Sequence, residues 1–242
     1  MTKRPLVVFD VNETLLDIDT LEPLFARIFA QGGMLRAWFA QVILYSQTLS
    51  LTGSYVSFGT LGGGVLRMLG QIHGVAISEE DVDELGARVA DMPVHPDVAA
   101  GLALLKDAGF SLVTLTNSPA SVGPDPLDKA GLGSMFERRF TVDTVRRFKP
   151  AEETYGVVSG AMGADPEDTW LVAAHTWDTI GAQIFGWKAA LVTRGVNAPL
   201  ILDGVPSPTV VARDVGEAAR AIVAAGAGFT RVTSTGKPGI AG

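Results

Sequence analysis

The sequence LVVFDVNETLLD, residues 6–17, carries the strongest structural signal in the chain. Four apolar residues, Leu6 to Phe9, are followed by a single carboxylate, Asp10. The run is too short for a helix and rich in β-branched residues, so it predicts a buried strand in the centre of a parallel sheet. Ligands of open α/β sheets lie beyond the carboxyl ends of the strands, which is where Asp10 stands. Taken alone, an Asp at this point is also compatible with a simple turn cap.

The composition bounds the class of protein. A chain of 242 residues with 47% apolar residues can form a real core, as one large domain or two modest ones. The lack of cysteine excludes disulfides and thiolate chemistry. The net charge of -7 argues against a nucleic-acid partner. The N-terminal apolar run is interrupted at Asp10 and no stretch reaches about 18 apolar residues, so we expect neither a signal peptide nor a membrane span, and a cytoplasmic location.

After Asp17 the apolar residues recur at helical spacing as far as Met92, and no strand pattern intervenes. The predicted helices are Leu21–Phe29, Met34–Leu51, Ser57–Ile72 and Ser78–Met92. The third contains Gly62-Gly63-Gly64, which is costly in a helix and predicts a kink or a close helix contact. An apolar face at Trp38, Phe39 and Val42 suits either a dimer contact or the chain's own core.

Beyond residue 94, strands and helices alternate, which favours right-handed crossovers and a parallel sheet. The predicted strands are Ser111–Leu115, Arg139–Val142, Thr169–Ala174, Ala189–Val192 and Thr209–Ala212. The predicted helices are Val98–Ala108, Leu127–Ala130, Glu152–Met162, Gly181–Phe185 and Val215–Ala225. The fold class is therefore α/β: a Rossmann-like parallel sheet core (1–16 and 94–227), an inserted all-helical cap domain (17–93) and a flexible C-terminal tail (228–242).

Four loops of the α/β part each follow a strand or open a helix, and each carries polar residues. These residues are Asp10 with Glu13, Thr116 with Asn117, Lys149, and His175 with Asp178. In a parallel sheet such loops meet at one edge. The convergence of four separate loops argues against the reading of Asp10 as a turn cap.

The segments FDVNETLLD, VTLTNS, FKPAEETY and AHTWD resemble the four ordered motifs of the haloacid dehalogenase-like hydrolases over most of residues 5–225. The Lys-Pro-x4-Tyr spacing from Lys149 to Tyr155 and the run from Trp177 to Ala182 are similar to the (S)-2-haloacid dehalogenases. This resemblance implies an enzyme without metal or other cofactor that turns (S)-2-haloalkanoic acids into (R)-2-hydroxy acids and halide. It also implies a homodimer.

The resemblance implies a role for each site residue. Asp10 would be the nucleophile, Lys149 would keep it ionised, and Asp178 would orient Lys149 or the hydrolytic water. The expected substrate-binding groups are the backbone N–H groups of Val11 and Asn12 with Thr116 for the carboxylate, Arg36 and Asn117 for the halide, and Tyr155 and Trp177 beside them. Arg36 is equally compatible with a solvated helix arginine. Tyr55 and Phe58 are further candidates for the pocket wall.

One alternative is a Mg²⁺-dependent phosphatase of the same superfamily, and another is a relative that has lost catalysis. Phosphatases of the superfamily usually carry a second Asp two residues after the first, as a general acid. Asn12 stands there in this chain and cannot donate a proton by ionising. A halide leaves as a stable anion and needs no acid, so Asn12 favours displacement at carbon.

Two departures from the dehalogenase pattern occur together. The dehalogenases usually have Tyr-Gly-Thr where this chain has Asn12-Glu13-Thr14, and Asn where it has His175. A carboxylate and an imidazole thus replace two neutral residues. We expect His175 to act as general base on water while Glu13 fixes its tautomer. The alternative is a local hydrogen bond for His175 and a solvent-facing Glu13.

Overall fold

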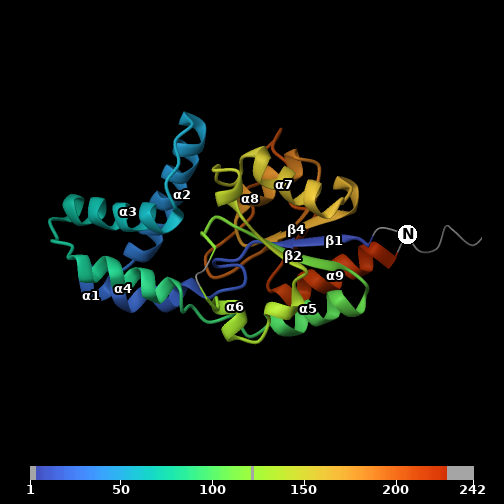
Figure 1. The fold of residues 1–242 in the computed structure, drawn as a ribbon, viewed down its shortest axis with the longest axis horizontal. Helices are drawn as coiled ribbons and strands as arrows, with labels where there is room; N and C mark the ends of the chain where they lie inside the picture. Colours follow the sequence, from blue (N-terminus) through green and yellow to red (C-terminus); the bar gives the residue numbers. More distant parts are fainter. Residues whose placement is uncertain (1–3, 121–122, 228–242) are drawn as a thin grey trace, which may run out of the picture.

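The computed structural model describes residues 4–120 and 123–227. Within these residues a six-stranded sheet has the order β3-β2-β1-β4-β5-β6, and every pair of neighbours is parallel (Figure 1). The strands are β1 (Leu6–Phe9), β2 (Ser111–Thr116), β3 (Arg138–Thr141), β4 (Thr169–Ala173), β5 (Lys188–Val192) and β6 (Val210–Ala212). The predicted α/β class with a parallel sheet is confirmed, and β1 lies at its centre.

Side chains of β1 alternate between the two faces of the sheet. Leu6 and Val8 belong to a cluster with Tyr155, whereas Val7 and Phe9 belong to the larger cluster that continues into the cap. Figure 1 shows α7 and α8 on one side of the sheet and α5 and α9 on the other. These helices are α5 (Val98–Asp107), α7 (Glu152–Met162), α8 (Thr176–Ile184) and α9 (Val215–Ala227). Burial on both faces explains why β1 is a continuous apolar run.

The residues between β1 and α5 form a helical cap beside the sheet (Figure 1). Its helices are α1 (Glu22–Phe29), α2 (Met34–Thr52), α3 (Phe58–His73) and α4 (Glu79–Val89). The two segments that connect cap and core run side by side. The Asp17 N–H donates to the Pro93 carbonyl at 2.8 Å, and the His95 N–H donates to the Leu15 carbonyl at 2.9 Å. The chain therefore leaves and returns at one place, close to Asp10.

The glycine triplet marks close helix contacts, and α3 continues through it without a break. A Cβ atom on Gly62 would lie 3.1 Å from the Trp38 ring, and one on Gly63 would lie 2.9 Å from a Val82 methyl group. Glycine thus lets α3 approach both α2 and α4. The apolar face at Trp38, Phe39 and Val42 is buried within this chain and forms part of its own core.

Helix α8 is longer than the sequence predicts. It begins at Thr176 instead of Gly181, so Trp177 and Asp178 lie in its first turn and not in a loop. The predicted C-terminal tail, 228–242, falls outside the described residues. None of the described helices combines the length and the apolarity required to cross a membrane. A short helix, α6 (Pro126–Lys129), follows β2 near the cap.

Candidate active site

The sheet topology brings the predicted polar residues together. Asp10 follows β1, Asn117 follows β2 and His175 follows β4, and these strands are neighbours in the sheet. Lys149 comes from the segment before α7. Burial is nearly complete: Asp10 is 4% exposed, His175 is 7% exposed, and Lys149 and Asp178 are fully buried. Such burial of ionisable groups requires each to have partners.

Lys149 stands between two carboxylates. Its Nζ donates to Asp10 Oδ1 at 2.8 Å, to Asp178 Oδ2 at 2.6 Å and to the Leu115 carbonyl at 3.1 Å. An ammonium group has three donors, and all three are used. Its backbone N–H donates to Asn117 Oδ1 at 3.0 Å. Burial opposes the charge of Lys149, but Asp10 and Asp178 raise its pKa above the ordinary value.

Tyr155 holds the far side of Asp178. Its hydroxyl donates to Asp178 Oδ1 at 2.7 Å, and its ring packs against Phe185 and Trp187 in the second core cluster. Tyr155 is fully buried and lines neither cavity at the site. The expected contact of Tyr155 with substrate is not found, because its side chain packs in the second core cluster and its hydroxyl faces Asp178.

The second oxygen of Asp10 has two donors. Thr14 Oγ1 donates to Asp10 Oδ2 at 2.7 Å, and His175 Nδ1 lies 3.2 Å from the same oxygen. The Thr14 hydroxyl in turn accepts from the Ala174 N–H at 2.8 Å. Sequence reasoning missed Thr14, although a hydroxyl residue four positions after Asp10 was a usable signal. Burial alone raises the pKa of Asp10, but Lys149 and His175 outweigh it and hold that pKa well below its usual range.

His175 lies between two carboxylates. Its Nε2 is 2.8 Å from Glu13 Oε2, and its Nδ1 faces Asp10. Ionised carboxylates only accept hydrogen bonds, so a ring with a carboxylate on each nitrogen donates from both and is an imidazolium. Burial lowers the pKa of His175, but the hydrogen bonds and charges of Asp10 and Glu13 raise it to about 9. At neutral pH this ring has no lone pair for a proton, which counts against a base in the unreacted site.

Glu13 reaches His175 through an unusual backbone conformation. Its φ is +65°, in the left-handed region that favours glycine, and such strain costs about 1–3 kcal/mol. The dehalogenase pattern has Gly here, the residue that adopts this conformation without steric cost, and this chain has a carboxylate instead. The Glu13 carbonyl accepts from His95 Nε2 at 3.2 Å, which helps to fix this turn. Burial raises the pKa of Glu13, but His175 and Arg36 lower it below the ordinary value.

Arg36 reaches the site from α2 of the cap. One guanidinium nitrogen donates to Glu13 Oε1, and the other donates to Asp19 Oδ1 at 2.6 Å. The side chain is 30% exposed. The structure therefore places Arg36 beside Glu13 with two acidic partners. Its expected role as a halide ligand stays a prediction. The ion pair with Glu13 would compete with a halide for the Arg36 guanidinium.

A small cavity of about 10 Å³ lies in front of Asp10. This volume holds roughly one water molecule. The residues that line it are Asp10, Asn12, Phe39, Ile43, Phe58, Thr116, Asn117, His175 and Trp177. The Trp177 ring stacks on His175 at 5.1 Å, and Phe39 lies 5.3 Å from the same ring. The site thus combines a buried ionised carboxylate with aromatic and apolar walls.

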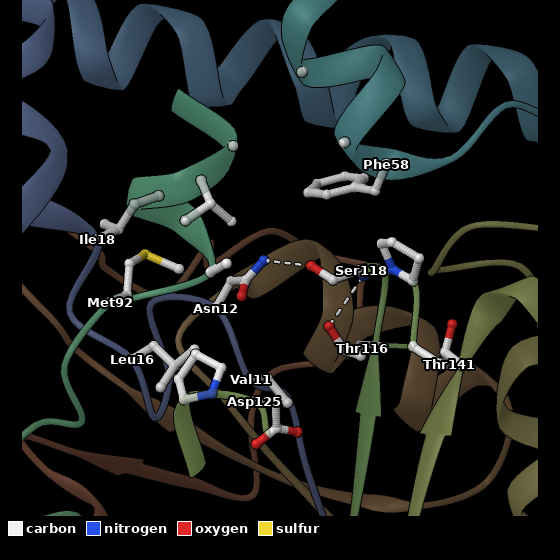
Figure 2. Close-up of a pocket in the computed structure, with 18 of the residues that line it drawn as sticks. Val11, Asn12, Leu16, Ile18, Phe58, Met92, Thr116, Ser118, Asp125 and Thr141 are labelled. Atoms are coloured by element: carbon white, nitrogen blue, oxygen red, sulfur yellow. Dashed lines mark hydrogen bonds between the residues drawn. The ribbon is translucent and has the colours of Figure 1, made fainter. Parts of the chain in front are cut away.

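Asn12 and Thr116 also border a second, larger cavity (Figure 2). Asn12 Nδ2 donates to Ser118 Oγ at 3.0 Å, and the Ser118 N–H donates to Thr116 Oγ1 at 3.1 Å. Val11 lines the same cavity. Of the groups expected to bind a carboxylate, Asn12 and Thr116 therefore lie at the junction of the two cavities, and Val11 lines the larger one.

The residues present fit Mg²⁺ poorly. This ion requires several oxygen ligands in octahedral geometry. Asp10 and Asp178 both bind the Lys149 ammonium, which supplies a positive charge where the ion would lie. No cluster of three or more His, Asp or Glu side chains suited to a metal is found among residues 4–120 and 123–227.

Comparisons with known proteins show the family of this chain. The model of the haloacid dehalogenase-like hydrolase family matches residues 5–186. The (S)-2-haloacid dehalogenase H-109 of Pseudomonas putida is 27% identical over 213 residues, which cover 87% of this chain and 94% of that protein. The L-2-haloacid dehalogenase of Xanthobacter autotrophicus, solved with chloropropionic acid covalently bound, superposes with a TM-score of 0.78 at 24% identity and covers 90% of this chain and 98% of that one. Another solved L-2-haloacid dehalogenase gives a TM-score of 0.83 at 24% identity, over 91% and 99%. The chain belongs to the haloacid dehalogenase-like hydrolases.

Proposed function

We propose that the protein is an (S)-2-haloacid dehalogenase that hydrolyses (S)-2-haloalkanoic acids to (R)-2-hydroxy acids through an ester on Asp10. The observation that carries the proposal is the state of Asp10. It is buried, ionised by Lys149 and His175, and faces an aromatic-walled cavity. The names of the relatives support the same reaction.

In the proposed first step, an Asp10 oxygen attacks C2 from the side opposite the halogen. The C2–O bond forms as the carbon–halogen bond breaks, the halide leaves with the bonding pair, and C2 is inverted. A halide is a stable anion, so no acid is required and Asn12 suffices where phosphatases have an Asp. Thr116 and the backbone N–H groups of Val11 and Asn12 would hold the substrate carboxylate, while Asn117 and Trp177 would border the halide.

In the proposed second step, water attacks the carbonyl carbon of the ester, the acyl C–O bond breaks, Asp10 is regenerated as a carboxylate, and the departing alkoxide takes up a proton that the water brought. Esterification removes the negative charge of Asp10, which is one of the two charges that raise the pKa of His175. That pKa then falls, His175 releases a proton to solvent, and Nδ1 gains a lone pair facing the ester. Glu13 keeps the proton on Nε2. The sequence-based hypothesis is thereby modified: His175 becomes a base only after Asp10 has reacted.

The Mg²⁺-dependent phosphatase is the competing proposal. Halide and phosphate release, measured in parallel with and without chelator, separate the two. We expect halide from bromoacetate and 2-bromopropionate in the presence of chelator. Phosphate release that chelator abolishes, with no halide from either acid, would overturn the proposal.

The ester route is tested by a single turnover in ¹⁸O-labelled water. Water cleaves the acyl bond, so the first label should enter the Asp10 carboxylate, and the first hydroxy acid should carry the original Asp10 oxygen. Label in the product of the first turnover would instead mean direct displacement by water. Mass spectrometry of the peptide that contains Asp10 gives the answer.

The expected homodimer, the cytoplasmic location and the lack of nucleic-acid or membrane partners remain predictions from the sequence. Analytical ultracentrifugation tests the first of these. A single species at the mass of one chain would contradict it.

A further inference from the structure

A cavity of about 540 Å³ lies between the cap and the core. Figure 2 shows the side chains that line it, among them Ile18, Phe58 and Met92. Helices α3 and α4 form one wall, and the ends of β2 and β3 with the start of α6 form the other. Its apolar side chains include Leu16, Ile18, Trp38, Phe58, Leu85 and Met92. The mechanism proposed above leaves most of this space unused.

The two cavities adjoin. Asn12, Phe39, Phe58 and Thr116 line both of them. Asn12 and Thr116 belong to the proposed carboxylate site, so a bound substrate carboxylate would lie at the junction. From there C2 would face Asp10, which lines the small cavity. A substituent on C2 would then lie beside the large cavity.

The charged groups of the large cavity are all paired with one another or with backbone. Among the described residues that line it, the ionisable side chains are Asp125, Asp128 and Arg139. Arg139 binds both carboxylates, and Asp125 and Asp128 also cap the start of α6. Two carboxylates and one guanidinium leave a net charge of about -1, which disfavours a second anionic group, and the remaining walls are mainly apolar, so the cavity suits an uncharged apolar occupant.

The size of the cavity points to a larger substrate than a haloacetate. Its volume falls within the range of about 300–1,000 Å³ that is usual for drug-sized ligands. A haloacetate or a 2-halopropionate has only a few heavy atoms and would leave the apolar walls in contact with water. Water in an apolar cavity has few hydrogen-bond partners, so an apolar group that displaces it gains affinity.

We propose that this cavity binds the C2 substituent of the substrate, and that the enzyme prefers 2-haloacids with a bulky apolar substituent such as butyl or benzyl. The inference rests on the proposed dehalogenase function and specifies its substrate class. The carboxylate stays at Asn12 and Thr116, C2 faces Asp10, and the substituent packs against α3 and α4.

The test is a substrate series: bromoacetate, 2-bromopropionate, 2-bromobutyrate, 2-bromohexanoate and 2-bromo-3-phenylpropionate, each as the (S) form where chiral. Burial of one CH₂ group contributes about 0.8 kcal/mol, so kcat/KM should rise about fourfold per added CH₂ until the cavity is filled. We expect at least a tenfold rise from 2-bromopropionate to 2-bromohexanoate. A flat or falling series would overturn the inference.

Glycine positions provide matched variants. Gly59 and Gly86 line the cavity, and a Cβ atom at either would meet no other atom within 4 Å. Gly59→Leu and Gly86→Leu should each lower the ratio of kcat/KM for 2-bromohexanoate to that for bromoacetate by about tenfold. Gly64→Leu is the control, since Gly64 lies on α3, has equally open surroundings and does not line the cavity. An unchanged ratio in both cavity variants, or an equal fall in the control, would contradict the proposal.

The outcomes separate the two levels of inference. If no 2-haloacid releases halide, the proposed function fails. If bromoacetate is turned over but longer substrates are not preferred, only the cavity assignment fails. Calorimetric titration with (R)-2-hydroxyhexanoate adds a readout without turnover: the wild type should bind it at least tenfold more tightly than (R)-lactate, and equal affinities would count against the assignment.

Discussion

The two oxygens of Asp10 are held in contrasting ways. On one side, Lys149, Asp178 and Tyr155 form a fully buried set that follows the motif pattern of the family. On the other, His175 and Glu13 depart from that pattern and lead through Arg36 to the cap and to solvent. In the proposed mechanism the Lys149 ammonium keeps its positive charge in both chemical steps. The positive charge of His175 can change between the steps, because an imidazolium loses its proton far more readily than an ammonium.

Replacement of Lys149 should have the largest effect. Lys149→Met removes the cation between Asp10 and Asp178 and leaves two buried carboxylates without their main partner. We expect a loss of about 3–5 kcal/mol in the free energy of unfolding, and no measurable turnover. Urea denaturation and halide release measure the two effects.

The matched control is Lys129→Met. Lys129 forms an exposed ion pair with Asp91, and exposed pairs contribute about 0–1 kcal/mol. Equal losses of stability in the two variants would show that burial of the Lys149 set has no special importance.

Replacement of His175 should separate the two chemical steps. His175→Ala leaves Lys149 on Asp10, so displacement of halide should still occur, while loss of a general base slows hydrolysis by about 10²–10⁴-fold. Rapid-quench measurement should therefore show a burst of one halide per site followed by slow turnover. A variant with normal steady-state turnover would remove His175 from the mechanism.

Glu13 should act through His175. Glu13→Gln keeps the size of the side chain and removes its charge. In a double-mutant cycle with His175→Ala, we expect the effect of Glu13→Gln on turnover to vanish once His175 is absent. Additive effects of the two changes on kcat would mean that Glu13 works independently.

The pH dependence of stability offers a smaller and more specific test. The pKa of His175 is raised from 6.5 to about 9, so its contribution to stability is complete below pH 6.5 and is lost as the pH rises through 9. The shift corresponds to a contribution on the order of 3 kcal/mol. The stability advantage of the wild type over His175→Gln should thus be larger at pH 6 than at pH 10. His73→Gln, at an exposed histidine on α3, serves as control, and an advantage of His175 that does not vary with pH would disprove the imidazolium.

The sequence predicted the fold and the meeting of the site residues for one physical reason. Parallel strands end at the same edge, so residues such as Asp10 and His175 that follow neighbouring strands must lie close together. Apolar periodicity gave β1, the cap helices and α7 with its observed bounds. The predicted start of α8, Gly181, was wrong by five residues. The polar residues before it resemble a loop, but they form the first helical turn.

The direction of individual side chains was beyond the sequence. Tyr155 has the motif spacing of a substrate contact, but α7 turns its hydroxyl toward Asp178. Arg36 is separated from Glu13 by an entire helix in the sequence, so their contact depends on how the cap packs. The 540 Å³ cavity arises in the same way, from surfaces of cap and core that no local pattern relates.

Replacement of Arg36 should have the smallest effect and tests how the His175–Glu13 side of Asp10 is supported. Arg36 is partly exposed and has Glu13 and Asp19 as partners, so Arg36→Gln should cost only about 1 kcal/mol of stability. The change also removes a cation that lowers the pKa of Glu13, so the pH profile of the hydrolytic step should shift while Kd for bromide stays the same. A direct halide ligand would behave in the opposite way, with weaker bromide binding and an unchanged profile. Arg36→Lys, which keeps the charge but offers fewer donors, should restore the profile if Arg36 acts on Glu13 through its charge.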